Sequence, residues 1–327
     1  MRTHFVLVVV FALVFQWNNG FAAPNKHSNL GSTSQDTVAA IPAKLGPSFS
    51  TFTTDSFCIV HDTDNIEAQK IAQLLELTYK QFQAAFKNQG FNLQNPDDKL
   101  MWVCFSDSDR FSNYALEADG MDLSWLSGYY SAKTNIVAII KPHKMPDGQK
   151  TGQEGTDADG SILAITSVPG RHADTVKIMH EAAHQFAFNT GLQKRRVMYP
   201  LWLSEGLAAS FEGGQTSGSN DERGRRLAKM YHQGKLVPLD EFVTMTRLPT
   251  DPVIHKDIYA QAWGLFNFLS KNRTGNLKNY LADIYKLEPG WRSAQTLHCE
   301  FVSAFGSIDE LDCSWQQFLR TFSAAKQ

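Results

Sequence analysis

The chain lacks a marked excess of charge of either sign. Lys and Arg together number 31 and Asp and Glu number 33, so the formal net charge is −2. Proteins that bind nucleic acid or anionic membranes mainly through charge carry a clear basic excess. The balance found here gives no electrostatic argument for such partners, and we expect no nucleic acid among its ligands.

Hydrophobic runs long enough to span a membrane are also missing. The longest apolar run covers residues 5–15, whereas a transmembrane helix needs about 20 residues. This run follows the basic start Met1-Arg-Thr-His4 and precedes the small-residue segment Gly20-Phe-Ala22, an order that is typical of a secretory signal peptide. We therefore predict a signal peptide over residues 1–22, export to the periplasm or the exterior, and no stable membrane insertion.

Cysteine is scarce, and its spacing excludes one class of metal site. The chain has four cysteines and no close Cys-x-x-Cys pair, which argues against zinc held by cysteines. In an oxidising compartment disulfides are the default state. Of the three possible pairings, we favour Cys58 with Cys104, which lie in predicted strands, and Cys299 with Cys313, which flank a predicted helix-turn-helix.

Periodicity divides the chain into a sheet-containing half and a helical half, without internal repeats. Residues 23–50, rich in Ser, Asn, Gly, Thr and Pro, are expected to form a flexible leader. The first half of the folded domain, residues 51–190, is predicted to hold strands over 56–61 and 99–105, helices over 64–88 and 107–117, and a hairpin over 126–140. A loop-like segment over 142–171 includes a possible extra strand over 161–167. The buried side of the 64–88 helix should carry Ile66, Ile71, Leu74, Leu75, Leu77, Tyr79, Phe82 and Phe86.

The second half, residues 191–327, reads as helical to its end. Beyond residue 220 the predicted helices cover 221–232, 239–246, 258–270, 277–285, 292–305 and 308–322. The sequence therefore predicts an α+β fold for residues 51–327, with a mixed sheet first and helices after it. A substrate cleft belongs between the two halves.

One helical segment carries a pattern with its own chemistry, His180-Glu-Ala-Ala-His184. Residues four apart lie on one face of an α-helix, so both imidazoles can bind one metal ion. Glu181 lies a quarter-turn away, where it can hold the water that the metal polarises. The helix is predicted to begin at an Asp174 N-cap and to stop at Gly191.

A catalytic zinc site needs a third protein ligand and an open position for water. A second predicted helix, from Pro200 to Gly213-Gly214, is apolar except for Glu205 and Glu212. The two carboxylates are seven residues apart and so share a face. We predict Glu205 as the third ligand and Glu212 as a residue that orients a histidine or the surroundings of Glu205. A solvated helix end is the alternative reading of Glu212.

These segments together carry a family resemblance. His-Glu-x-x-His followed by Trp-Leu-x-Glu-Gly-x-Ala resembles the gluzincin metallopeptidases, and more closely the bacterial, secreted peptidase MA-like group of unknown function. The resemblance covers roughly residues 52–290 and implies a thermolysin-like domain with one Zn²⁺, a peptide or protein substrate, and Glu181 as general base. Tyr259, in Tyr-Ala-Gln-Ala-Trp, resembles the transition-state tyrosine of gluzincin aminopeptidases; the alternative is an aromatic residue that packs in the core.

The resemblance also bears on how a substrate is held. The chain lacks the Gly-x-Met-Glu-Asn segment by which gluzincin aminopeptidases hold a free amino end, so we expect endopeptidase-like cleavage. The strand at residues 135–140 is expected to be an edge strand that pairs with an extended peptide. The pairing residues would be Asn135, Ile136, Val137 and Ala138. Competing functions are a zinc-dependent amide hydrolase acting on cell-wall material and a non-catalytic exported binding module.

Overall fold

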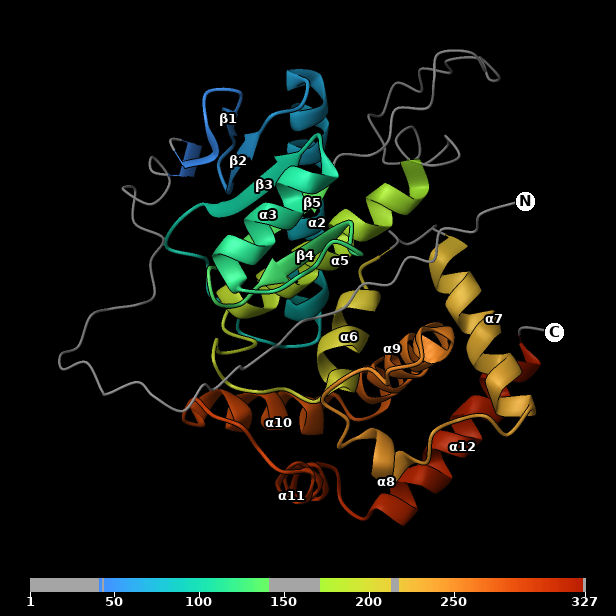
Figure 1. Ribbon diagram of the computed structural model, residues 1–327. Helices are drawn as coiled ribbons and strands as arrows, with labels where there is room; N and C mark the ends of the chain where they lie inside the picture. The colour runs from blue at the N-terminus through green and yellow to red at the C-terminus, as the bar shows by residue number, and fades with distance from the viewer. Residues whose placement is uncertain (1–40, 43, 141–170, 213–217, 326–327) are drawn as a thin grey trace, which may run out of the picture.

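The computed structural model describes residues 41–42, 44–140, 171–212 and 218–325, and its first half is built on a five-stranded mixed sheet (Figure 1). The strands are β1 (Ser50–Thr53), β2 (Phe57–His61), β3 (Leu100–Phe105), β4 (Gly128–Ser131) and β5 (Ile136–Ile140). Their order is β1-β2-β3-β5-β4, with the three central strands parallel and both outer strands antiparallel to their neighbours. The predicted α+β class and the predicted hairpin are confirmed.

The position of β5 contradicts one prediction about the substrate. This strand pairs in parallel with β3 on one side and in antiparallel fashion with β4 on the other, so neither of its edges is free for a peptide. The expectation that Asn135, Ile136, Val137 and Ala138 form an exposed edge is therefore wrong. The physical reason is burial, because the nearly all-apolar β5 fits an interior position that is covered on both faces.

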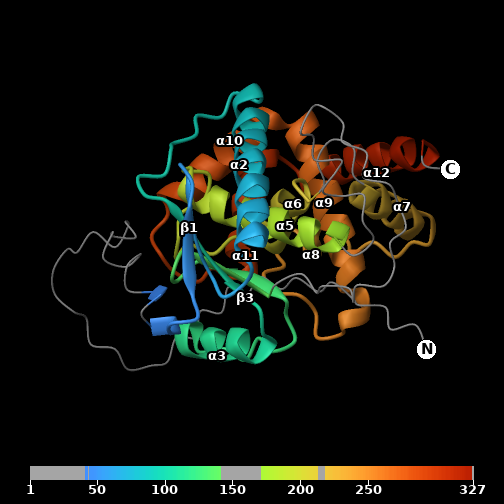
Figure 2. The same cartoon turned by 90° about the horizontal axis from the view of Figure 1, so that it is seen from above.

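Helices cover both faces of the sheet. Helices α2 (Asn65–Asn88) and α5 (Arg171–Asn189) pack on one face, and α3 (Ser108–Asp119) packs on the other (Figure 2). The alternation along β3 follows this division, since Trp102 faces α2 and α5 whereas Met101 faces α3. Asp64 and Asp107 cap α2 and α3, accepting bonds from backbone N–H groups.

Several boundary predictions need correction. Ile66 is 58% exposed because it lies in the first turn of α2, before the stretch that packs on the sheet. Ile41 and Phe49, placed by sequence in the leader, are buried in the core beneath α3. The predicted signal peptide and the possible strand over 161–167 lie outside the described residues.

The second half is helical, as predicted. It consists of α6 (Leu201–Ala209), α7 (Gly218–His232), α8 (Leu239–Phe242), the 3₁₀ turn η1 (Pro252–Ile254), α9 (His255–Asn272), α10 (Thr274–Lys286), α11 (Ala294–Phe305) and α12 (Ile308–Ala324). Helix α6 packs along α9 and also contacts α5 (Figure 1). One hydrophobic core runs from Trp102 under the sheet through Trp202 on α6 to Trp315 on α12. The two predicted halves are therefore joined through α6, and no helix in the described segments is long and apolar enough to cross a membrane.

The structure overturns both predicted disulfides, because all four cysteines are free. Cys58 lies in the core on the α3 side of the sheet, and Cys104 lies in the core on the opposite side. A disulfide needs Cβ atoms about 3.8 Å apart, which side chains on opposite faces of a sheet do not reach. Cys299 and Cys313 are exposed thiols on α11 and α12.

Candidate metal centre

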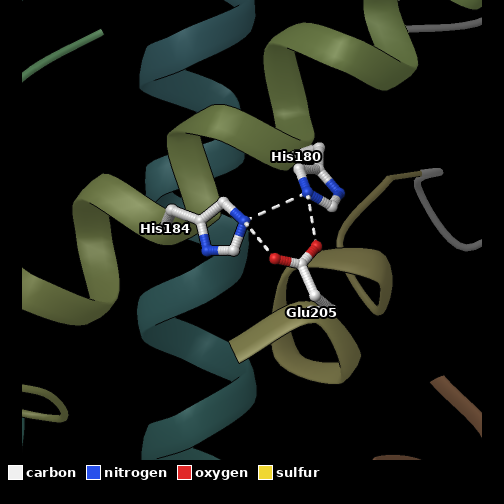
Figure 3. Close-up of side chains that lie close together, drawn as sticks. All are labelled: His180, His184 and Glu205. Atoms are coloured by element: carbon white, nitrogen blue, oxygen red, sulfur yellow. Dashed lines mark hydrogen bonds and ion pairs between the residues drawn. The ribbon is translucent and has the colours of Figure 1, made fainter. Parts of the chain in front are cut away.

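Three side chains converge at the junction of α5 and α6 (Figure 3). His180 and His184 project from α5, and Glu205 projects from α6. The two Nε2 atoms are 3.0 Å apart, Glu205 Oε2 is 3.3 Å from His180 Nε2, and Glu205 Oε1 is 3.8 Å from His184 Nε2. All three residues are at most 2% exposed. The structure thus brings together the three predicted ligands, in an arrangement that could hold a metal ion.

The spacing of these atoms matches the needs of a small tetrahedral ion. Two donor atoms that each lie about 2.0–2.1 Å from one zinc ion are roughly 3.3 Å apart. The observed separations of 3.0, 3.3 and 3.8 Å bracket that value. A metal ion could therefore enter with small side-chain adjustments.

The α5 helix is held against the sheet by the residue that follows His184. Gln185 Oε1 accepts a 2.8 Å hydrogen bond from Trp102 Nε1. Its amide nitrogen donates to the Met101 carbonyl at 3.1 Å and to the Asn135 carbonyl at 3.0 Å. Because this amide is fully buried and bonded to β3 and to the residue before β5, it fixes the position of α5 and hence of the histidines.

The ends of the two ligand-bearing helices differ partly from the predictions. Helix α5 begins at Arg171, so Asp174 lies in its first turn and is not its N-cap. Gly191 has φ +83°, which confirms the predicted stop. Helix α6 ends at Ala209, because the Ser210 N–H bonds back to the Gly206 and Leu207 carbonyls and tightens the last turn.

Glu212 therefore lies in the turn after α6, yet it still reaches the cluster. Its Oε1 is 2.6 Å from His180 Nδ1, and it is 1% exposed, so the alternative of a solvated helix end is wrong. A neutral His180 that donates from Nδ1 turns its Nε2 lone pair towards Glu205 and His184, which is the tautomer a metal ligand needs. The predicted orienting role is thus supported by geometry.

Arg223 on α7 is a site residue that the sequence did not indicate. Its Nη2 donates to Glu212 Oε1 at 2.5 Å, and its Nη1 donates to Glu212 Oε2. Burial opposes ionisation of Glu212, but the Arg223 charge and the His180 hydrogen bond outweigh it and lower the pKa of that carboxyl. In the sequence Glu-Arg-Gly-Arg-Arg, Arg223 looks like one cation of a solvated helix face.

The site gathers three buried carboxyl groups around its two histidines. Glu181, Glu205 and Glu212 are all at most 2% exposed, and Arg223 offsets one of their three possible negative charges. Burial, with a further contribution from the Glu205 charge, raises the pKa of Glu181 to about 7. Burial also raises the pKa of Glu205. A divalent ion bound between the histidines and Glu205 would provide a positive counter-charge for these buried carboxylates.

Two buried polar atoms beside the cluster, Glu181 Oε1 and the Tyr259 hydroxyl, have no hydrogen-bond partner among the residues that the structure describes. Tyr259, on α9, has its ring centroid 6.4 Å from that of His180. The Glu181 carboxylate accepts a hydrogen bond from the backbone N–H of Tyr130 on the outer strand β4. Buried polar atoms without partners are uncommon in folded proteins. Both atoms could therefore form a hydrogen bond with a water molecule or ligand at the cluster.

The close packing of α6 on α9 depends on Gly206, the residue after Glu205. A Cβ atom at this position would lie 2.7 Å from Phe266 Cβ and would also clash with the Ala262 carbonyl oxygen. We expect Gly206→Ala to lower the free energy of unfolding by about 1–3 kcal/mol. Because the clash pushes α6 away from α9, metal binding through Glu205 should weaken as well.

Thermal unfolding and zinc titration of purified protein test this prediction. Gly275→Ala on α10 is the matched control, since an added Cβ there meets nothing within 4 Å. Equal stability of the two variants would show that the α6–α9 approach does not require glycine.

Comparison with known proteins adds one match. Residues 174–289 match a family described as proteins of unknown function, DUF1570. The matched range includes the candidate ligands His180, His184 and Glu205 as well as Tyr259. No curated protein matches the chain.

Proposed function

We propose that the protein is a zinc-dependent peptidase with an endopeptidase-like cleft. The observation that carries this proposal is the buried convergence of His180, His184 and Glu205. Beside it lies an oxygen of Glu181 that has no hydrogen-bond partner within the described part of the chain. Two histidines and one carboxylate leave the open position that a catalytic zinc site needs, whereas structural zinc sites use four protein ligands. The donor set of nitrogen and oxygen atoms also suits zinc.

In this mechanism each residue near the cluster has a separate task. When bound, zinc supplies a Lewis acid that polarises water and the scissile carbonyl. Glu181 accepts the proton of the attacking water and later delivers a proton to the leaving amine. Tyr259 donates a hydrogen bond to the oxygen of the carbonyl as negative charge develops on it. Glu212 keeps His180 in the tautomer and orientation of a ligand.

We further propose that the domain is a thermolysin-like, gluzincin-type peptidase that acts outside the cytoplasm after loss of residues 1–22. Support comes from the mixed sheet packed on the helix that bears His180 and His184, and from the sequence resemblance. The outer strand β4 runs antiparallel to β5 and reaches the site through the backbone of Tyr130. If a peptide pairs with the sheet on this side, we expect it to pair with β4, the outermost strand there in the described part of the chain.

The same residues would hydrolyse an amide that is not part of a protein, because the chemistry does not depend on what flanks the bond. A zinc-dependent amide hydrolase acting on cell-wall material is therefore the alternative. The purified protein, freed of metal and reloaded with zinc, should be incubated with a peptide library and with peptidoglycan. Mass spectrometry that shows zinc-dependent internal cleavage of peptides supports the proposal. Products from peptidoglycan alone would favour the alternative, and no products from either would favour a binding module.

Tyr259→Phe tests the assigned oxyanion donor. The loss of one such donor costs about 10²–10³ in kcat. We expect a fall of that size while zinc affinity stays unchanged, since the hydroxyl makes no hydrogen bond to a ligand among the described residues. Tyr280→Phe on α10 is the matched control, because that hydroxyl is also buried without a partner. A kcat of Tyr259→Phe equal to that of the control would leave Tyr259 as a core aromatic residue.

A further inference from the structure

A chain of polar contacts links α7 to the metal site, and it begins at Arg223. We propose that Arg223 is a positioning residue for the ligand His180 and acts through Glu212, so that its loss weakens zinc binding. The proposal rests on the proposed metal site and adds to it a residue that contacts neither the metal nor a substrate.

The contacts that carry the proposal are continuous; His180 and Glu212 are buried, and the Arg223 side chain is 17% exposed. Arg223 Nη1 donates to Glu212 Oε2, and Arg223 Nη2 donates to Glu212 Oε1. One of these oxygens, Oε1, also lies 2.6 Å from His180 Nδ1. A two-point contact fixes the plane of the carboxylate as well as its position. The direction in which Glu212 accepts from His180 is therefore set from α7.

The need for Arg223 follows from the place of Glu212 in the chain. Helix α6 ends at Ala209, so Glu212 lies in the turn beyond it. Its own backbone is not helical, and the position of its side chain therefore depends on contacts with other elements. Among the described residues, hydrogen bonds to Glu212 come from His180 and Arg223. Arg223 in turn is carried by α7, which packs on α9 and α12. Contacts from the helical half of the molecule thus fix the orientation of His180 on α5.

The charge of Arg223 also affects the pKa values of other residues at the site. Burial raises the pKa values of Glu205 and Tyr259, and the Arg223 charge opposes both rises. A second cation near the cluster, the buried Lys177, lies on α5, where its ammonium group is 3.3 Å from the Ile140 carbonyl and 3.8 Å from Asp174. Arg223 is therefore the cation placed to hold Glu212.

A purely stabilising ion pair is the competing interpretation. Buried ion pairs often contribute little net stability, and removal of one partner is costly in any context. A stabilising pair would affect unfolding without a specific effect on zinc affinity. A positioning residue changes zinc affinity in variants that remain folded, and only while the Glu212 carboxylate is present.

The test is a zinc titration of the metal-free full chain against a competing chelator. We expect Arg223→Met to weaken zinc binding by about 10–100-fold, the usual cost of losing a partner behind a metal ligand. The matched control is Arg226→Met on the same helix, which removes a 2.7 Å ion pair to Asp257 that is 28–36% exposed. The zinc affinity of that variant should stay within about twofold of wild type, because solvent-exposed ion pairs contribute little.

A double variant separates action through Glu212 from any other route. Glu212→Gln keeps the size of the side chain and an acceptor for His180, but it removes the charge that Arg223 holds. Adding Arg223→Met to Glu212→Gln should change zinc affinity by less than about threefold, well below its effect in the wild-type background. Circular dichroism and thermal unfolding establish that each variant is folded.

Each outcome decides the proposal. Failure of wild type to bind zinc overturns the proposed metal site, whereas wild-type affinity in folded Arg223→Met overturns this inference alone. Equal weakening by Arg226→Met, or an undiminished effect of Arg223→Met on the Glu212→Gln background, also overturns it. If Arg223→Met does not fold, Arg223→Lys replaces it, with Arg226→Lys as control. Lysine keeps the charge but loses the two-point contact, so zinc affinity should fall several-fold if the inference holds and stay unchanged if it does not.

Discussion

Glu181→Gln is expected to retain the fold and full zinc content while turnover falls by about 10²–10⁴-fold. The factor is the usual contribution of a positioned general base. Gln has nearly the same volume as Glu, and its amide oxygen can accept the bond that the Tyr130 N–H now donates to Glu181. The amide cannot accept a proton from water, so binding persists while the chemical step fails.

The measurement pairs zinc content with turnover on whichever substrate the hydrolysis screen identifies. Glu76→Gln provides the control, because Glu76 is a partly buried carboxylate on α2 that accepts hydrogen bonds from Thr54 and Ser56 and is not one of the clustered candidate ligands. It should leave turnover unchanged. Wild-type turnover in Glu181→Gln would mean that another group takes the proton of the water.

His184→Ala is expected to abolish zinc binding. The imidazole is 1% exposed and supplies one of three converging donor atoms. Two protein ligands remain after its removal. The loss of zinc affinity should exceed the 10–100-fold that follows when a residue hydrogen-bonded to a metal ligand is removed. Elemental analysis after dialysis should therefore show about one zinc per wild-type chain and almost none in this variant.

Thermal unfolding gives an independent view of the same change. A ligand that binds only the folded state at 100 times its Kd adds about 2.7 kcal/mol of stability. Zinc should therefore raise the Tm of wild type and of the control His298→Ala, which alters a histidine on α11. It should leave the Tm of His184→Ala unchanged. Full zinc retention by His184→Ala would remove this residue from the ligand set.

The candidate ligands could be predicted from the sequence because their signals are local. A four-residue spacing on a helix places His180 and His184 on one face, and Glu205 stands out as a carboxylate in an apolar helix. Glu212 was expected at the site through helical periodicity, but it arrives there from the turn after α6. The expected contact with a histidine is present, although the predicted helix end is wrong.

Features that depend on how strands and helices pack in three dimensions could not be predicted from local sequence patterns. The hairpin over 126–140 was evident, yet its pattern does not say which of its strands lies outermost. The pairing of Cys58 with Cys104 assumed side chains on one face, whereas the β2–β3 register places them on opposite faces. Arg223 gives no signal in an arginine-rich helix, because only the packing of α7 brings it to Glu212.

Zinc-edge X-ray absorption of the purified wild-type protein tests the central claim most directly. If His180, His184 and Glu205 hold the ion, the spectrum should show a first shell of four nitrogen and oxygen atoms at about 2.0–2.1 Å with two imidazoles. A shell that contains sulfur at about 2.3 Å would place zinc on the free cysteines. That result, or the absence of imidazole scattering, would contradict the assignment of this cluster as the metal centre.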